Sequence, residues 1–153
     1  MAVARLTRPV IPRVERRDGA ANLSELFPNF RSAPYPILLD SAMSDPQFGR
    51  YSYLTADPFL VLRCRGRHIV LEHDGQREEF DGDPLVILRD LLGHFVISDL
   101  PGLPPFQGGA AGYVGYDLAR CLEQLPVRAN DDLELPEFCL PFYDWVLARD
   151  SLN

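Results

Sequence analysis

The chain has 153 residues, of which 46% are hydrophobic and 24% charged, values typical of a globular domain large enough to bury a core. Its net charge of −7 argues against binding to nucleic acid, because a basic surface is needed to contact the phosphate backbone. No apolar run approaches the about 20 residues of a membrane span, and the first residues lack the pattern of a secretory signal. We therefore expect a cytoplasmic protein that binds neither nucleic acid nor membranes.

Lysine is absent, and all 15 basic residues are arginines. The chain therefore cannot form a Schiff base or supply the lysine of a phosphate-binding loop. The three cysteines, at positions 64, 121 and 139, lack the spacing of a disulfide framework or a zinc site, and we expect buried free thiols. The histidines also lack a metal-binding spacing, so no metal site is expected in this chain.

The first residues of the chain predict little regular structure. Residues 1–20 contain several arginines and prolines without an apolar period, and we expect an extended or weakly ordered lead-in, with one domain over 21–153. Asn22 and Glu25 have the spacing of a capping box, which predicts a short helix that ends at Pro28.

The next part of the chain predicts an antiparallel sheet. An apolar run over 35–41 predicts a buried strand, and residues 50–56 alternate as a half-exposed strand. Turn signals at Gly66 and at 74–75 separate three further strands, which predicts a meander. The meander strands are expected at 59–65, 67–73 and 76–80. The arginines at 63, 65 and 67 share one strand face, which we interpret as solvated, with an anion site as the alternative.

Helical and glycine-rich segments follow the meander. Asp83 and Pro84 form a helix start before an amphipathic helix over 84–95, and residues 100–107 are expected to be loop. The glycine-rich segment 108–117 predicts a strand that enters a short helix. Its glycines favour close packing over a phosphate cradle, because the GxG of a dinucleotide fingerprint is missing. With a last strand over 138–149, the class is α+β, a mainly antiparallel sheet with a few short helices.

Polar residues at the end of the first predicted strand form the best candidate site. Asp40 and Ser41 close the apolar run, and Phe48, Gly49, Arg50 and Tyr51 open the next strand. This set combines an acceptor, a hydroxyl, a cation and aromatic rings, which suits a small amphoteric ligand. The alternative is structural, with Asp40 capping the turn and Arg50 pairing with it.

Three segments in order resemble the amino-terminal domain of anthranilate synthase component I and its relatives, the aminodeoxychorismate synthases (para-aminobenzoate synthases). They are Leu38–Ala42 with Gly49–Leu54 and Asp57-Pro58, the run Gly108–Asp117, and Leu135–Val146. In that family a larger carboxy-terminal domain holds chorismate and Mg²⁺. The resemblance therefore implies no cofactor in this chain, Mg²⁺ in the parent enzyme, and a non-catalytic chain whose partners are the missing chorismate-binding domain and a glutamine amidotransferase subunit.

The resemblance also implies a pocket for tryptophan at the candidate site. In anthranilate synthases this feedback site is built around a Leu-Leu-Glu-Ser motif, and here Asp40 replaces the glutamate while Ser41 matches the serine. Phe48, Gly49, Arg50 and Tyr51 match the contacts at the strand entry. The shorter carboxylate favours aminodeoxychorismate synthase, which makes 4-amino-4-deoxychorismate for folate.

Two alternatives remain at this point. One is the regulatory domain of anthranilate synthase component I, in tryptophan biosynthesis, and the other is a stand-alone module that binds an aromatic amino acid. A domain of this kind also keeps an apolar face for its larger partner. We expect that face on Phe142–Leu147 and on the glycine-rich segment, and we expect the isolated chain to cover part of it by forming a homodimer.

Overall fold

The computed structural model describes residues 13–17, 22–41, 43, 45, 48–96, 100–126 and 131–152. Most of the expected lead-in over 1–20 lies outside these residues, and positions 13–17 carry neither helix nor strand. No helix in the described ranges is both long and apolar enough to cross a membrane.

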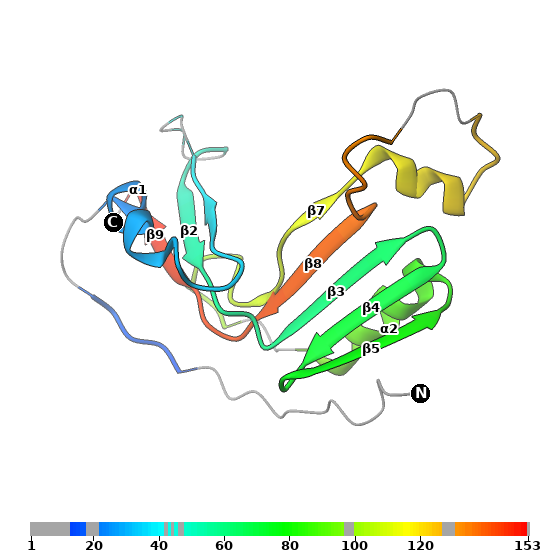
Figure 1. Cartoon of the computed structure of the whole chain (residues 1–153). Helices are drawn as coiled ribbons and strands as arrows, with labels where there is room; N and C mark the ends of the chain where they lie inside the picture. The colour runs from blue at the N-terminus through cyan, green and yellow to red at the C-terminus, as the bar shows by residue number, and fades with distance from the viewer. Residues whose placement is uncertain are drawn as a thin grey trace.

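The strands form two antiparallel sheets, which confirms the expected α+β class with a mainly antiparallel sheet (Figure 1). The smaller sheet has the order β1-β2-β9, with β1 at Ile37–Leu39, β2 at Tyr51–Thr55 and β9 at Leu147–Asp150. The larger sheet has the order β5-β4-β3-β8-β6, and β7 also pairs with β8. Its strands are β3 (Leu60–Arg65), β4 (His68–His73), β5 (Gln76–Asp81), β6 (Gly109–Ala110), β7 (Tyr113–Val114) and β8 (Phe138–Tyr143).

The meander predicted from the turn signals is present as β3, β4 and β5. Leu62 pairs with Leu71 across the first ladder, and Ile69 pairs with Phe80 across the second. The prediction succeeds because each strand is joined to the next by a tight turn, so that local chemistry determines the register.

The chain passes between the two sheets twice, from β2 into β3 and from β8 into β9 (Figure 1). Residues 138–149 are therefore two strands in different sheets, and the prediction of one continuous strand is wrong. Hydrogen bonds brace the passage: the Thr55 hydroxyl donates to the Trp145 carbonyl at 2.7 Å, and the Tyr143 hydroxyl donates to the Tyr35 carbonyl at 2.7 Å. Each of these bonds satisfies a polar group beside the core.

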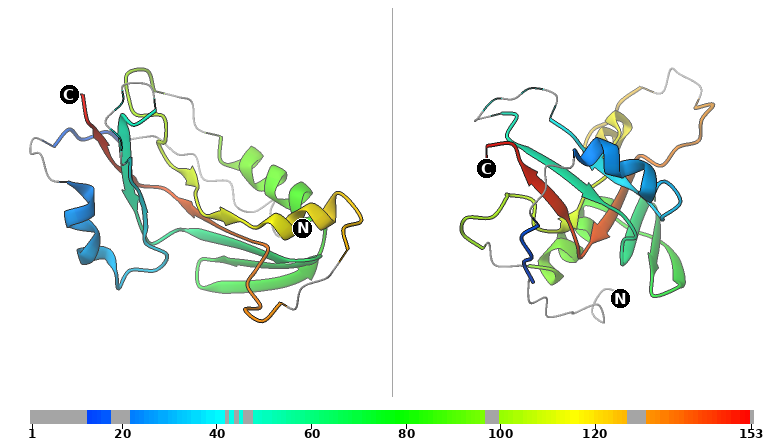
Figure 2. Two further views of the ribbon diagram at one scale, coloured as in Figure 1. Left: turned by 90° about the horizontal axis from the view of Figure 1, so that it is seen from above. Right: turned by 90° about the vertical axis from the view of Figure 1, so that its left-hand side faces the viewer.

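The main core lies between one face of the larger sheet and the helix α2 (Pro84–His94), which covers that face (Figure 2). Leu91 of α2 and Phe138 and Phe142 of β8 are fully buried there. Phe59, Phe95 and Phe142 pack at one end, with ring centroids 5.0 to 6.4 Å apart. Each fully buried side chain of this size contributes roughly 1.5–3 kcal/mol.

The short helices begin where the sequence predicts but end differently. Asp83 caps α2 by accepting from the backbone N–H groups of Leu85 and Val86. The first helix, α1, covers Leu23–Leu26 and continues as the 3-10 helix η2 over Phe27–Phe30. Pro28 therefore does not end the helical segment, because proline is tolerated in a first turn, where its missing N–H has no partner to lose.

Candidate functional site

The candidate residues at the end of β1 are joined by a chain of hydrogen bonds. Ser52 Oγ donates to Asp40 Oδ1 at 2.8 Å and accepts from the backbone N–H of Ser41 at 3.3 Å. The Ser41 hydroxyl donates to the main-chain carbonyl of Tyr51 at 2.7 Å. Asp40 is exposed and Ser41 half-buried, so this network lies at the surface end of the smaller sheet.

β1 is less buried than the sequence predicts. It covers only Ile37–Leu39, its residues are half-buried or exposed, and it forms an edge of the smaller sheet. An apolar run that ends in polar residues is equally typical of a covered central strand and of an edge strand, so the sequence did not separate them.

The loop between β1 and β2 fixes Gly49 against the chain. A Cβ at position 49 would lie 1.5 Å from the main-chain oxygen of Met43, so only glycine fits there. The Gly49 N–H donates to the Asp45 carbonyl at 2.9 Å, and the Phe48 N–H donates to Asp45 Oδ1 at 2.9 Å. The Phe48 ring is 78% exposed.

Arg50 pairs with Asp150 at the end of β9, and the structural alternative of an Arg50–Asp40 pair is wrong. Its Nε and one terminal nitrogen bond the two Asp150 oxygens at 2.8 and 2.6 Å, and these bonds raise the pKa of Arg50 above its usual value. The guanidinium also lies 4.8 Å from the centre of the Tyr51 ring. The register of β2 on β9 explains the partner, because Tyr51 lies directly opposite Asp150.

The structure thus arranges the candidate residues in two groups. Asp40 and Ser41 are linked through Ser52, while Arg50 and Tyr51 are linked to Asp150. The Tyr51 main chain connects the groups, since its carbonyl accepts from Ser41.

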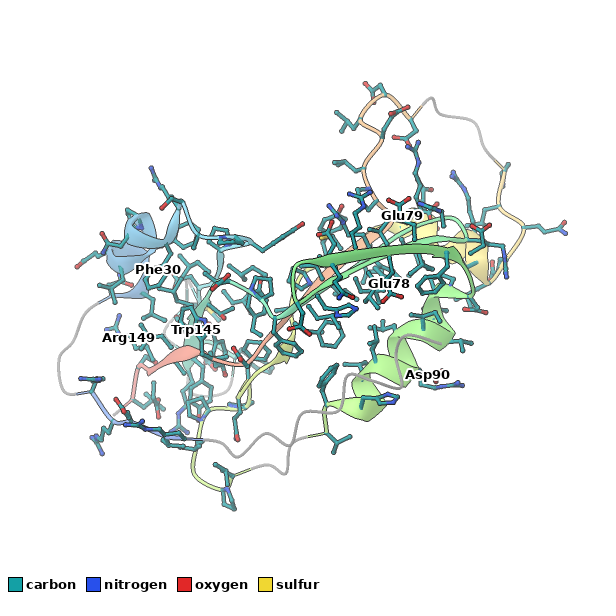
Figure 3. The ribbon with its side chains drawn as sticks, turned by 60° about the horizontal axis from the view of Figure 1, so that its bottom comes forward. Phe30, Glu78, Glu79, Asp90, Trp145 and Arg149 are labelled. Carbon is teal, nitrogen blue, oxygen red and sulfur yellow. The ribbon has the colours of Figure 1, made fainter. Side chains whose placement is uncertain are left out.

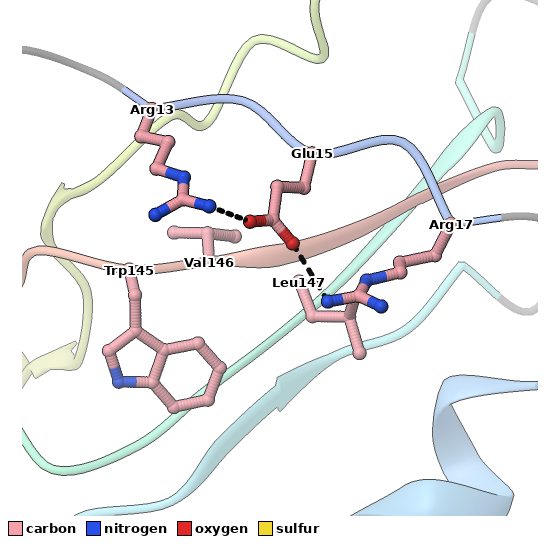
Figure 4. A pocket seen from close by; sticks show the side chains of 6 residues that line it. All are labelled: Arg13, Glu15, Arg17, Trp145, Val146 and Leu147. Atoms are coloured by element: carbon pink, nitrogen blue, oxygen red, sulfur yellow. Dashed lines mark hydrogen bonds and ion pairs between the residues drawn. The ribbon is translucent and has the colours of Figure 1, made fainter.

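A hollow that the sequence did not suggest lies beside Trp145 (Figure 4). It is open, has a volume of about 390 Å³, and is bounded on one side by Arg13, Glu15 and Arg17. Glu15 accepts from both arginines at 2.6 and 2.7 Å, and the two arginine side chains are largely exposed. The rings of Trp145 and Phe30, both labelled in Figure 3, pack with their centroids 5.8 Å apart. This hollow could not be predicted from the sequence, because segments 13–17 and 145–147 lie far apart along the chain.

The arginines of β3 face a sheet surface rich in carboxylates, which favours the interpretation as a solvated face over an anion site. Arg63 pairs with Glu72, and Arg65 pairs with Asp131 at 2.8 Å. Glu79, labelled in Figure 3, is 3.3 Å from His68 and 2.7 Å from an Arg77 nitrogen. Arg67 lies outside the strands, in the β3–β4 turn.

The glycine-rich segment packs closely against β8, as its spacing predicts. A Cβ on Gly112 would lie 2.1 Å from the main-chain oxygen of Cys139. The segment forms β6 and β7 and then a 3-10 helix, η3, over Tyr116–Cys121, in place of the α-helix expected from about 118. Tyr116 is 86% exposed.

The cysteines are free thiols, but only one is fully buried. Cys64 is 1% exposed, Cys139 is half-buried, and Cys121 is exposed, so the expectation of three buried thiols is wrong for Cys121. Cys121 ends a short surface helix, where an apolar residue has little to pack against. Among the described residues, no group of three or more histidine, cysteine or carboxylate side chains is arranged to hold a metal ion.

Comparison with known proteins places this fold. No protein-family model matches the chain. Anthranilate synthase component 1 of Acetivibrio thermocellus is 40% identical over 129 residues, 84% of this chain and 26% of that protein. Aminodeoxychorismate synthase component 1 of Escherichia coli (strain K12) is 34% identical over 150 residues, 95% of this chain and 32% of that protein. The chain belongs to the family of anthranilate and aminodeoxychorismate synthase component 1.

A solved member of this synthase family agrees with that assignment. The crystal structure of anthranilate synthase component I from Streptococcus pneumoniae TIGR4 superposes with a TM-score of 0.54 at 26% identity, covering 92% of this chain. The chain spans only 30% of that protein, and about a quarter to a third of the relatives above. Both synthase names occur among relatives of similar identity, so overall similarity does not select one reaction.

Proposed function

We propose that this chain is the amino-terminal part of an aminodeoxychorismate synthase component 1, which aminates chorismate to 4-amino-4-deoxychorismate for folate synthesis. We further propose that this part does not itself catalyse. In the aminodeoxychorismate synthases that the chain resembles, an active-site lysine lies in the carboxy-terminal domain. This chain has no lysine, so that residue must come from another part of the protein. Mg²⁺ and chorismate would bind there, and a glutamine amidotransferase subunit would supply ammonia.

The hydrogen bonding of Asp40 is the observation that favours aminodeoxychorismate synthase over anthranilate synthase. Its carboxylate is one methylene shorter than the glutamate of the feedback motif, and it accepts from Ser52 at 2.8 Å. The Ser41 hydroxyl is likewise engaged with the Tyr51 carbonyl. An amino-acid ligand would have to replace these bonds, which supports a structural role for the strand end and the branch without strong tryptophan feedback.

Product analysis of the full-length protein tests this proposal. We expect chorismate, Mg²⁺ and ammonia to yield 4-amino-4-deoxychorismate, which keeps the enolpyruvyl group of chorismate. Anthranilate formation releases that group as pyruvate. Pyruvate produced in step with an aromatic amine would therefore reject this assignment in favour of anthranilate synthase. The chain of 153 residues alone should give no turnover under the same conditions.

Anthranilate synthase component I is the second candidate, because the relative of 40% identity and the solved structure both carry that name. On this assignment, or for a stand-alone module that senses an aromatic amino acid, the strand end would bind tryptophan through Ser41 and Arg50, with Phe48 and Tyr51 beside the indole. For an incomplete pocket we expect a dissociation constant in the high-micromolar range or weaker, as a rough estimate.

Calorimetry with tryptophan and the variants Ser41→Ala and Arg50→Ala measures this pocket. Tryptophan binding that both variants weaken would favour the regulatory domain or the stand-alone module. Binding that neither variant weakens would reject the pocket, and Arg77→Ala, on β5 of the larger sheet, serves as a control.

An exposed apolar surface supports the proposal that this part packs against the rest of the protein. We define the β7–η3 surface by the residues Tyr113, Val114, Tyr116, Leu133 and Leu135, each between 44% and 86% exposed. Tyr116 and Val114 belong to the glycine-rich segment on which such a face was expected. The other segment named for that face, Phe142–Leu147, contributes only in part, because Phe142 and Tyr143 are buried while Trp145 is 36% exposed.

A further inference from the structure

Two thiols lie close to the β3–β4 turn, and neither has a role in the function proposed above. Cys64 lies on the buried face of β3, and Cys121 is the exposed last residue of η3. The Cys64 sulfur is 3.2 Å from the main-chain oxygen of Gly66, and the Cys121 sulfur is 3.9 Å from the same atom. The two sulfurs are therefore no farther apart than the sum of these distances, 7.1 Å.

The third cysteine cannot join this pair, because it lies on the opposite face of the sheet. Cys64 lies across from Phe138 in the β3–β8 ladder, and Cys139 lies across from Arg63. Neighbouring residues of a strand point to opposite faces, so Cys139 shares the face of Arg63. Cys139 is thus a matched control within the same strand pair.

We propose that Cys64 and Cys121 are a redox-active pair, which a small disulfide compound such as oxidised glutathione converts into an intramolecular disulfide. A disulfide requires about 2.05 Å between its sulfurs, so the side chains must approach. Cys121 provides the movement, because it is exposed at the end of a six-residue 3-10 helix, whereas Cys64 is held in the core.

The exchange proceeds in two balanced steps. The Cys121 thiolate attacks one sulfur of oxidised glutathione, the glutathione S–S bond breaks, and one glutathione leaves and takes a proton. Cys64 then loses its proton, attacks the Cys121 sulfur and displaces the second glutathione. The Glu137 carboxylate accepts from the Gly66 N–H at 2.5 Å, and its Oε2 is 3.9 Å from the Cys64 sulfur, where its negative charge adds to burial in raising the pKa of Cys64. Two protein thiols are oxidised, and one glutathione disulfide is reduced to two thiols.

The environment of the pair makes the reaction slow at neutral pH. Burial raises the pKa of Cys64 to about 12 and also raises the pKa of Cys121, and only the thiolate is a nucleophile. The rate should therefore rise with pH. A reduced form whose thiolates are not stabilised is less favoured, so the disulfide should resist reduction once formed.

Mass spectrometry of the 153-residue chain after incubation with oxidised glutathione tests the proposal. We expect a product that has lost two hydrogen atoms and carries no glutathione, with Cys64 and Cys121 joined in one cross-linked peptide. Cys139→Ser should give the same product. Cys121→Ser should abolish it, and Cys64→Ser should stop at a glutathione adduct on Cys121.

Peptide mapping of the unsubstituted chain decides the outcome even if a Cys64 variant fails to fold. A lasting glutathione adduct on Cys121, or a cross-link that involves Cys139, would overturn the proposal. Thermal unfolding gives an independent measure. Closing the long loop between β3 and η3 should raise the midpoint on the order of 10 °C in the oxidised chain and in oxidised Cys139→Ser, but not in Cys121→Ser.

Discussion

At the scale of single residues, Gly112 shows how closely two backbones approach in this fold. An added Cβ would lie 2.1 Å from the Cys139 carbonyl oxygen and 3.1 Å from the Pro141 ring. Neither atom belongs to a flexible side chain, so the strands would have to separate. We expect Gly112→Ala to lower the free energy of unfolding by about 3 kcal/mol, measured by urea denaturation.

Gly93 provides the control for this substitution. It lies in α2 with no atom within 4 Å of its would-be Cβ, and alanine is the better helix former. Gly93→Ala should raise the free energy of unfolding by up to about 1 kcal/mol. If the two substitutions change the free energy of unfolding equally, the close approach of Gly112 to β8 does not exclude a side chain at that position.

The hydrogen-bond partner of a side chain can be predicted from the sequence where the two residues are close along the chain. The Asp83 cap and the Asp74-Gly75 turn follow this rule, since their partners lie within a few residues. The partner of Arg50 does not, because Asp150 is brought opposite by the register of β2 on β9. The same limit hid the proximity of Cys64 and Cys121, which depends on the placement of η3 beside the distant β3–β4 turn.

At the scale of elements, the start of α2 depends on one carboxylate. Asp83 Oδ1 accepts from the N–H groups of Leu85 and Val86 at 3.0 and 3.2 Å, which would otherwise lack partners. We expect Asp83→Ala to destabilise the protein by about 1 kcal/mol in urea denaturation. Asp81→Ala is the matched control, because the Asp81 side chain is 80% exposed, and its effect should stay within about 0.5 kcal/mol.

The elements that the sequence predicted least well are those that change sheets. The apolar run over 138–149 has the composition of a strand throughout, yet Phe138–Tyr143 joins the larger sheet and Leu147–Asp150 joins the smaller one. The composition of a segment indicates whether it is buried, but it does not indicate which strand the segment pairs with. The bend between them is set by tertiary contacts such as the Thr55–Trp145 hydrogen bond.

At the scale of the whole molecule, several thiol and phenol groups are buried or half-buried, which predicts that the folded protein loses stability at alkaline pH. Burial raises the pKa of Cys64 to about 12 from 9.0, and it also raises the pKa values of Tyr143 and Tyr53. Above pH 9 the unfolded chain loses the Cys64 proton while the folded chain retains it. The unfolded state then binds fewer protons, so stability falls as pH rises, by up to about 1.4 kcal/mol per pH unit for this thiol.

Urea denaturation in the presence of a reductant between pH 8 and pH 10 measures this effect. Cys64→Ala should be less stable at pH 8, because it leaves a cavity, but its stability should fall less steeply between pH 9 and pH 10. If the free energy of unfolding falls equally steeply with pH with and without the Cys64 thiol, the pKa of Cys64 is not raised in the folded protein.

The β7–η3 surface makes a further prediction about the molecule as a whole. Tyr116 and Val114 are 86% and 57% exposed, and exposed apolar side chains that gather on one surface favour contact with another protein. In the isolated chain the available surface is a second copy, so we expect a weak dimer in sedimentation velocity as concentration rises. Replacing both residues with serine should shift the chain to monomer, because the apolar contact is lost without disturbing the buried core.

Phe48→Ser is the control, since Phe48 is also largely exposed but lies on the β1–β2 loop, and it should leave the dimer intact. A chain that stays monomeric at all concentrations, or a dimer weakened only by Phe48→Ser, would place the contact elsewhere.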